Sequence, residues 1–149
     1  MIVFKLIAAV CSDGGMGYKG QLPWPHCKAD MAHFAKRTTG AGNNAVIMGK
    51  KTWDSIPARP LRNRANLILS SHPPEQVRTD QSEHWFKTVP DLLAHLEFAK
   101  YDEAWIIGGA SIYEQFLAMH NRNEIRIDEM CITQMEGTHE CDTFFPLLK

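Results

Sequence analysis

Residues 104–113 read Ala-Trp-Ile-Ile-Gly-Gly-Ala-Ser-Ile-Tyr. The apolar half is typical of a buried strand, and the two glycines lead directly into a helical pattern. Glycine lets a backbone approach a ligand closely, and the free N–H groups at a helix start favour a pyrophosphate. Because paired glycines also serve tight strand-to-helix turns, this stretch alone leaves phosphate binding and a plain turn both open.

The same order of strand and helix recurs along the chain. Further apolar strands are predicted at residues 2–10, 45–48, 66–71, 84–89 and 124–135, with helices opening near 28, 49 and 88. The first of these runs is almost continuously apolar, which indicates a strand buried on both faces. Alternating strands and helices predict an α/β fold with a central, mostly parallel sheet flanked by helices. No repeat or linker interrupts the pattern, so residues 1–149 are predicted to form one domain.

Composition excludes several classes of protein. Sixteen basic and 17 acidic residues give a net charge of -1, which provides no basic excess for nucleic acid. No apolar run is long enough to span a membrane, and the N-terminal run lacks a signal-peptide cleavage site. The four cysteines form no CxxC pair and have no histidine spacing suited to zinc, so no metal is predicted. Reduced thiols and a cytoplasmic location follow.

Residues 21–34 read Gln-Leu-Pro-Trp-Pro-His-Cys-Lys-Ala-Asp-Met-Ala-His-Phe. The two prolines forbid a helix until about Cys27 or Lys28, where a helical pattern starts. In that helix Asp30 shares a face with Met31 and Phe34. A lone carboxylate there is either a first-turn acid that complements the helix dipole or a buried group with a chemical role.

Two glycine-containing stretches invite comparison with phosphate-binding loops. Gly49-Lys50-Lys51-Thr52 follows a strand, but a P-loop needs a glycine five residues before Gly49, where Asn44 stands. The strand-to-helix junction still favours anions, although the two lysines can equally be plain solvated side chains. The glycines of residues 12–17 do not match a dinucleotide fingerprint. They predict either a mobile loop over a site or an ordinary linker.

Together these stretches resemble the dihydrofolate reductase family. The matching residues, in order along the chain, are Ile7-Ala8-Ala9, Met16-Gly17, Leu22-Pro23-Trp24, Asp30, Phe34, Val46-Ile47-Met48-Gly49, Thr52-Trp53, Ser55-Ile56, Arg59-Pro60-Leu61, Arg64, Ile68-Leu69-Ser70-Ser71, Ile107-Gly108-Gly109, Tyr113-Glu114-Gln115-Phe116, Thr133 and Asp142-Thr143. The resemblance covers nearly the whole chain. It implies the three-layer fold of that family and the reduction of 7,8-dihydrofolate to tetrahydrofolate by NADPH.

The resemblance also implies roles for the substrate site. Asp30 matches the carboxylate that accepts hydrogen bonds from the pterin N3–H and 2-amino group, with water delivering the proton to N5. Thr133 matches the hydroxyl that hydrogen-bonds this carboxylate, and Arg64 matches the arginine that holds the substrate carboxylate. The apolar walls are implied to be Ile7, Met31, Phe34, Ile56 and Leu61. The remaining substrate-binding residues are implied to be Ala8, Ser55, Ile107 and Thr133.

Cofactor binding is implied in the same way. Ala9, Met16, Gly17, Ile107 and Tyr113 would surround the nicotinamide, with Tyr113 counted among the catalytic residues. The pyrophosphate would lie on Gly108, Gly109, Ala110, Ser111 and Ile112. The adenosine side with its 2′-phosphate would contact Gly49, Lys50, Lys51, Thr52, Leu69, Ser70 and Ser71. Leu22 and Trp24 would belong to a loop that closes over the site and would take part in catalysis.

Two departures from the family pattern stand out. Ser111 occupies a position where many members have a basic residue. The family usually has a further β-hairpin after the position of Phe145-Pro146, so the strand at 124–135 is expected to be a sheet edge, open to homodimer formation. Antifolates are expected as inhibitors. The rival interpretations are a pyrimidine reductase of riboflavin synthesis and a binding or structural protein that keeps the fold.

Overall fold

The computed structural model describes residues 2–11, 13–17, 28–56, 59–74, 82–135, 141 and 143–146. Its helices are α1 (Lys28–Thr39), α2 (Lys50–Ser55), α3 (Val89–Ala99) and α4 (Ala110–Asn121). Its strands are β1 (Val3–Val10), β2 (Gly15–Gly17), β3 (Asn44–Gly49), β4 (Arg64–Leu69), β5 (Glu83–Phe86), β6 (Glu103–Gly108), β7 (Ile127–Gln134) and β8 (Thr143–Phe144). Among these residues, no helix is long and apolar enough to cross a membrane.

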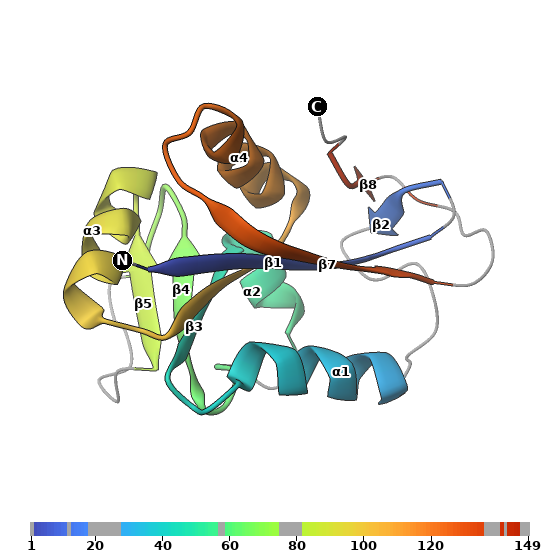
Figure 1. Cartoon of the computed structure of the whole chain (residues 1–149), viewed down its shortest axis with the longest axis horizontal. Coiled ribbons are helices and arrows are strands. Elements are labelled where there is room, and N and C mark those ends of the chain that lie inside the picture. The colour runs from blue at the N-terminus through green and yellow to red at the C-terminus, as the bar shows by residue number, and fades with distance from the viewer. Residues whose placement is uncertain are drawn as a thin grey trace.

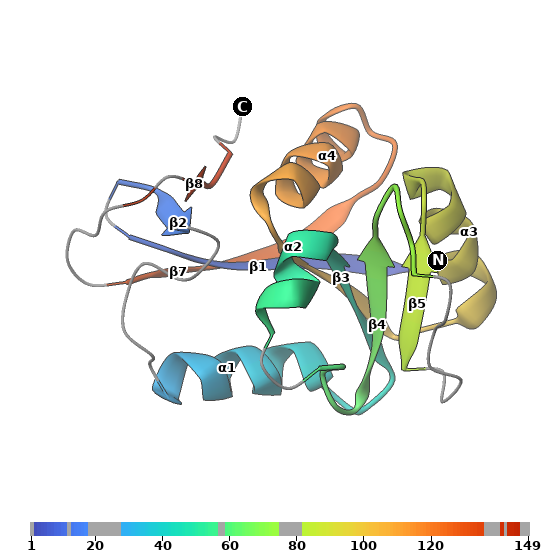
Figure 2. The ribbon, with the colours of Figure 1, turned by 180° about the vertical axis from the view of Figure 1, so that it is seen from behind.

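A six-stranded sheet forms the centre of the molecule (Figures 1 and 2). Its strand order is β5-β4-β3-β6-β1-β7, and every neighbouring pair is parallel. The predicted α/β class with a mostly parallel sheet is therefore confirmed. β1 pairs with β6 on one side and β7 on the other, as its continuous apolar sequence predicted.

Helices cover both faces of the sheet, so the fold has three layers. Figure 1 shows α4 and α1 on opposite sides of the sheet. Successive residues of one strand serve the two faces: Ile47 packs in the core under α3 and α4, whereas Val46 and Met48 pack in the core under α1 and α2. β1 and β6 divide their side chains in the same manner. The core under α1 and α2, which contains the buried Trp53, is called the α1/α2 core below.

One predicted apolar set is partly wrong at β7. Ile127 is buried and Met130 packs against the core under α3 and α4, although their numbering puts them on opposite faces of a regular strand. A register shift resolves this, because Phe4 pairs with Ile127 while Lys5 pairs with Glu129. The extra residue rotates the strand by one position. Ile132, which was expected among the buried residues, is 38% exposed.

The helix predicted near residue 88 is α3. The Thr88 side chain caps it by accepting a hydrogen bond from the Asp91 N–H at 3.3 Å, and a proline follows in the first turn. Leu92 and Leu96, four residues apart, are buried as expected. Phe98 was placed in the same apolar stripe and is 85% exposed. Six residues beyond Leu92 is the far side of a 3.6-residue helix, so that part of the prediction is wrong.

A second, two-stranded sheet lies outside the predictions. β2 and β8 pair antiparallel, with Gly15 opposite Phe144. The sequence suggested only a loop for residues 12–17, because three glycines in a short segment favour turns. The pairing attaches the chain near residue 144 to the turn that follows β1.

A histidine cluster between α3 and β5 makes stability depend on pH. The His95 ring lies 4.6 Å from the His84 ring between centroids, and its Nε2 is 2.8 Å from the Tyr101 hydroxyl. Burial, and then the charge of His84, lower the pKa of His95. The folded state therefore disfavours a proton that the unfolded chain accepts below about pH 6.5. Stability that is fully present above that pH is lost as the pH falls toward the lowered pKa.

We expect the free energy of unfolding in urea to fall between pH 7 and pH 5.5, and to fall less in His95→Gln. Glutamine keeps a hydrogen-bonding group near Tyr101 but cannot titrate. The matched control is the exposed His72→Gln, which should retain the slope of the parent because it leaves the cluster around His95 unchanged. Equal slopes for the parent and His95→Gln would remove His95 as the cause.

Candidate active site

Two helices start at the carboxyl ends of neighbouring strands. β3 leads through Gly49 into α2, and β6 leads through Gly109 into α4, while β3 and β6 pair with each other. Neither N-cap glycine offers a side chain to the first turn of its helix. Helix N–H groups at adjoining positions attract anions, and ligands of parallel sheets bind at this edge.

Gly108 has a backbone conformation that suits only glycine. Its φ is +122°, and the Gly108–Gly109 peptide bond is cis. A Cβ at Gly108 would lie 3.1 Å from the Tyr113 hydroxyl. That hydroxyl is 2.8 Å from the Ile7 carbonyl oxygen and 2.9 Å from that of Ile107, and it donates to this pair. Burial raises the pKa of Tyr113, so the hydroxyl stays a donor and ties β1 to β6.

Apolar residues predicted to line the substrate site come together in the α1/α2 core. They are Ile7, Phe34, Ile56, Leu61 and Ile107, packed with the buried Trp53 and Met48. They come from five separate segments of the chain. Two predicted members are not part of this core: Met31 is 43% exposed, and the Ala8 side chain packs in the core on the opposite face. Contact of Ala8 with a ligand would have to use its backbone.

Asp30 lies in the first turn of α1 and is half-buried. Its carboxylate forms no hydrogen bond or ion pair with any other residue that the structure describes. The helix runs along β7, since Arg37 bonds to Glu129 and His33 Nε2 lies 3.5 Å from Cys131 Sγ. From the first contact to the second, the helix advances by four residues and the strand by two, which is roughly 6 Å along each element.

The same spacing continued by four helical residues and two strand residues leads to the first turn of α1, which carries Asp30, and to Thr133 on β7. The two residues are thus brought to the same end of the α1–β7 contact. Within the described part of the chain no hydrogen bond joins their side chains directly. The hydroxyl-to-carboxylate contact implied by the resemblance therefore stays a prediction.

Arg64 begins β4 and is held against α1. Its Nε donates to the Arg62 carbonyl at 2.8 Å, and one terminal nitrogen donates to the Thr38 hydroxyl at 3.0 Å. Thr38 in turn donates to the Phe34 carbonyl at 2.8 Å. Burial lowers the pKa of Arg64, and an anionic ligand would offset that desolvation. The guanidinium therefore sits one helical turn from the predicted aromatic wall.

The predicted adenosine side is exposed and already paired. Lys50 Nζ donates to Asp54 at 2.7 Å, four residues along α2. Lys50, Asp54, Trp53, Arg59 and His72 line a pocket of about 480 Å³. The His72 N–H donates to Ser70 Oγ at 3.1 Å, and Ser71 Oγ lies 2.9 Å from His72 Nδ1. A phosphate entering here would compete with the Asp54 carboxylate for the charge of Lys50.

Several of the remaining predicted residues fall into three groups. Ala9 lies opposite Thr133 in the β1–β7 pairing, and Met16 packs against the core under α3 and α4. Ser55 and Ser111 are exposed, and each hydroxyl forms a hydrogen bond within its own helix. Ser55 donates to the Thr52 carbonyl at 2.7 Å, and Ser111 accepts from Gln115 at 3.1 Å. The predicted catalytic residues Leu22 and Trp24 lie outside the described residues, as does Asp142.

Two buried polar residues near the site were not predicted. Thr38 is 0% exposed and supports Arg64, as described above. Asn66 is also 0% exposed: its Oδ1 accepts from the Leu61 N–H at 2.9 Å, and its Nδ2 donates to the carbonyls of Leu61 and Arg64 at 3.0 Å. The amide thus fixes the loop that carries Leu61. The only sequence signal was a polar residue heading an apolar strand.

Comparison with known proteins places these features in a family. The family model described as dihydrofolate reductase matches residues 3–149. The chain is 35% identical to the dihydrofolate reductase of Heliothis virescens, over 97% of this chain and 80% of that protein. It is 36% identical to the enzyme of Rattus norvegicus, over 94% and 76% respectively. It is 36% identical to the viral dihydrofolate reductase of Saimiriine herpesvirus 2 (strain 488), over 98% and 70%.

Proposed function

Because this chain belongs to the dihydrofolate reductase family, we propose that it reduces 7,8-dihydrofolate to 5,6,7,8-tetrahydrofolate with NADPH, and so supplies one-carbon and thymidylate metabolism. The observation that carries the proposal is the placement of a half-buried carboxylate, Asp30, beside an apolar cluster with Arg64 at its other end. A flat heterocycle with a carboxylate tail has the chemistry that such a site recognises.

The substrate would be oriented by three groups of this chain. Asp30 would accept hydrogen bonds from the pterin N3–H and 2-amino group, a charge-assisted pair. The α1/α2 core residues Phe34 and Leu61 would contact the rings, and Arg64 would hold the terminal carboxylate through its planar fork. With Asp30 engaged in this way, its negative charge would favour a proton on N5, which water would deliver.

The start of α4 is where this chain would hold the pyrophosphate of NADPH. The N-cap residue Gly109 has no side chain, so no side chain caps the first-turn N–H groups of α4. Bound there, NADPH would supply the hydride for pterin C6. Ala110 and Ser111 would contact the pyrophosphate of the cofactor, and Ala9 and Ile107 would lie beside its nicotinamide.

A direct assay tests the function. The purified chain should oxidise NADPH only when dihydrofolate is added. An antifolate that mimics the pterin should stop the reaction, because it would bind the Asp30 carboxylate in place of the substrate. Oxidation with the pyrimidine intermediate of riboflavin synthesis, but not with dihydrofolate, would favour the related reductase. Activity with neither compound would favour a binding or structural protein that keeps the fold.

Cofactor choice should depend on Lys50 and its partner. Lys50→Ala should raise the Michaelis constant for NADPH by roughly 10- to 150-fold and barely change that for NADH, because one charge-assisted contact to the 2′-phosphate is worth roughly 1.5–3 kcal/mol. The matched variant Asp54→Asn removes the carboxylate that holds Lys50 at 2.7 Å, and should lower the NADPH constant. Equal losses for both cofactors in Lys50→Ala would show that Lys50 does not read the 2′-phosphate.

Three broader proposals accompany the activity. Residues 1–149 act as one dihydrofolate reductase-like domain, and the protein works in the cytoplasm without nucleic acid or membrane partners.

β7 is the outer strand of the sheet in the described residues, so self-association through it would pair its open N–H and C=O groups. Light scattering should then show a dimer at micromolar concentration, whereas a clean monomer would reject this pairing.

A further inference from the structure

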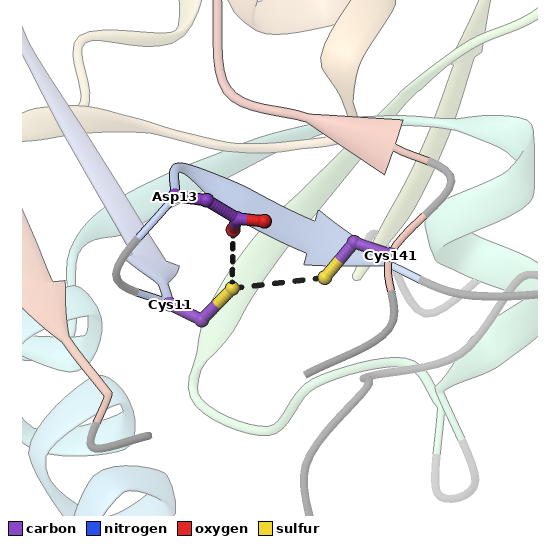
Figure 3. Close-up of side chains that lie close together, drawn as sticks. All are labelled: Cys11, Asp13 and Cys141. Carbon is purple, nitrogen blue, oxygen red and sulfur yellow. Dashed lines mark hydrogen bonds between the residues drawn. The ribbon is translucent and has the colours of Figure 1, made fainter. Parts of the chain in front are cut away.

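Three potential metal ligands meet at the turn that follows β1. Cys11 Sγ lies 2.7 Å from Asp13 Oδ1 and 3.7 Å from Cys141 Sγ (Figure 3). One ligand atom from each residue lies within 4.8 Å of the others. Cys11 and Cys141 are 130 residues apart, so their spacing in the sequence gave no indication of a shared site.

Backbone contacts build this cluster independently of any ligand. The Cys11 N–H donates to the Gly15 carbonyl at 2.8 Å, and the Gly15 N–H donates to Asp13 Oδ1 at 3.0 Å. The β2–β8 pairing, together with the Phe145 N–H bond to the Gly14 carbonyl at 2.9 Å, brings the chain near Cys141 onto the same turn. A Cβ on Gly15 would lie 2.3 Å from Cys141 Sγ, so that thiol fills the space the glycine leaves.

The distance between the two sulfur atoms suits one shared ion. Two thiolates bound to a tetrahedral zinc, each at about 2.3 Å, lie roughly 3.8 Å apart. The observed separation is 3.7 Å, whereas a disulfide needs about 2.05 Å. The Asp13 carboxylate lies against the same sulfur, so an oxygen ligand is within reach of the same ion.

We propose that Cys11, Asp13 and Cys141 form a binding site for a thiophilic divalent cation of the zinc class. The two thiols release their protons on binding, the Asp13 carboxylate supplies an oxygen in place of its contact with the Cys11 thiol, and solvent takes the fourth position. Cys11 is buried and Asp13 is exposed, which gives the ion a route from water to the buried thiol. Magnesium and calcium, which prefer oxygen ligands alone, are excluded.

The bound ion would join the end of β1 to the segment that leads into β8. Without it, two main-chain pairings and the Phe145 ring, 5.1 Å from the Tyr113 ring between centroids, hold that segment. A cation that binds only the folded chain stabilises it. At a hundredfold excess of zinc over its dissociation constant, the melting temperature of this chain should rise by roughly 5–10 °C.

The test uses the full chain, reduced and freed of metal by a chelator. Zinc titrated against a competing chelator should bind one equivalent, and cadmium should give a thiolate-to-metal charge-transfer band in the ultraviolet. Cys141→Ser should weaken zinc binding at least tenfold, and Asp13→Asn should weaken it less. The double variant Cys27→Ser with Cys131→Ser is the matched control and should bind zinc like the parent.

A second measurement uses the parent chain alone, in case Cys141→Ser does not fold. Zinc should protect Cys11 and Cys141, but not Cys131, from alkylation, as mapped by peptide mass spectrometry. Protection of neither cysteine, or loss of binding in the control variant, would overturn the site. So would a chain that is 2 Da lighter under mild oxidation by glutathione disulfide and binds no zinc when reduced, since that result assigns the pair to a disulfide.

Discussion

Asp30→Asn should lower kcat at pH 7 by roughly 100- to 1,000-fold while leaving the fold and NADPH binding intact. An amide can neither carry the negative charge that favours a proton on N5 nor accept both pterin N–H bonds, and positioned proton transfer contributes 10²–10⁴-fold in typical enzymes. The loss should shrink in acid, where protonated dihydrofolate brings its own proton. Stopped-flow measurement of hydride transfer from pH 5 to pH 9 would reveal both effects.

The control for this experiment is another first-turn acid. Asp91 occupies the first turn of α3, as Asp30 does in α1, but it is exposed, and α3 packs on the opposite face of the sheet from the α1/α2 core. If Asp30 only complements the helix dipole, both substitutions should cost a similar 0.3–1 kcal/mol or so of stability and leave the rate unchanged. A rate for Asp30→Asn close to that of the parent at pH 7 would remove this carboxylate from the mechanism.

The fold was predictable because its signals are local. The apolar runs that became β1, β3 and β6 are buried whatever their neighbours, so periodicity and turn residues suffice to find them. The cap formed by Thr88 and the prolines around Trp24 act within a few residues. Prediction failed where a tertiary partner decides the outcome. β2 exists because β8 pairs with it, and the burial pattern of β7 depends on a register shift against Phe4.

At the candidate site, too, some features could be predicted from the sequence and others could not. Resemblance identified the apolar residues that meet in the α1/α2 core, since packing preserves the residue type at each position. It did not indicate two polar contacts made by residues predicted to bind the ligands. The Asp54 carboxylate would compete with the 2′-phosphate for Lys50. The hydrogen bond from Arg64 to Thr38 holds the guanidinium that is predicted to bind the substrate carboxylate. The second of these contacts joins residues 26 positions apart, and no motif spacing encodes it.

Gly108→Ala should destabilise the protein by about 3 kcal/mol, which corresponds to a fall in melting temperature of roughly 6–12 °C. A side chain at φ +122° is strained, and its Cβ would lie 3.1–3.3 Å from three atoms of the Tyr113 ring and hydroxyl. Tyr113 cannot move aside easily, because it is buried and its hydroxyl serves the carbonyls of Ile7 and Ile107. Any displacement would also disturb the start of α4, so the Michaelis constant for NADPH should rise.

Gly109→Ala is the matched control, one residue along the same junction. Its φ is -86°, and the nearest atom to an added Cβ is Thr52 Oγ1 at 3.6 Å, an ordinary contact. Its melting temperature should therefore stay within about 4 °C of the parent, equivalent to 1 kcal/mol or so. Calorimetry of both variants without ligand separates this steric effect from cofactor binding. Equal losses at the two glycines would contradict the assignment of the cost to Tyr113 and to the positive φ of Gly108.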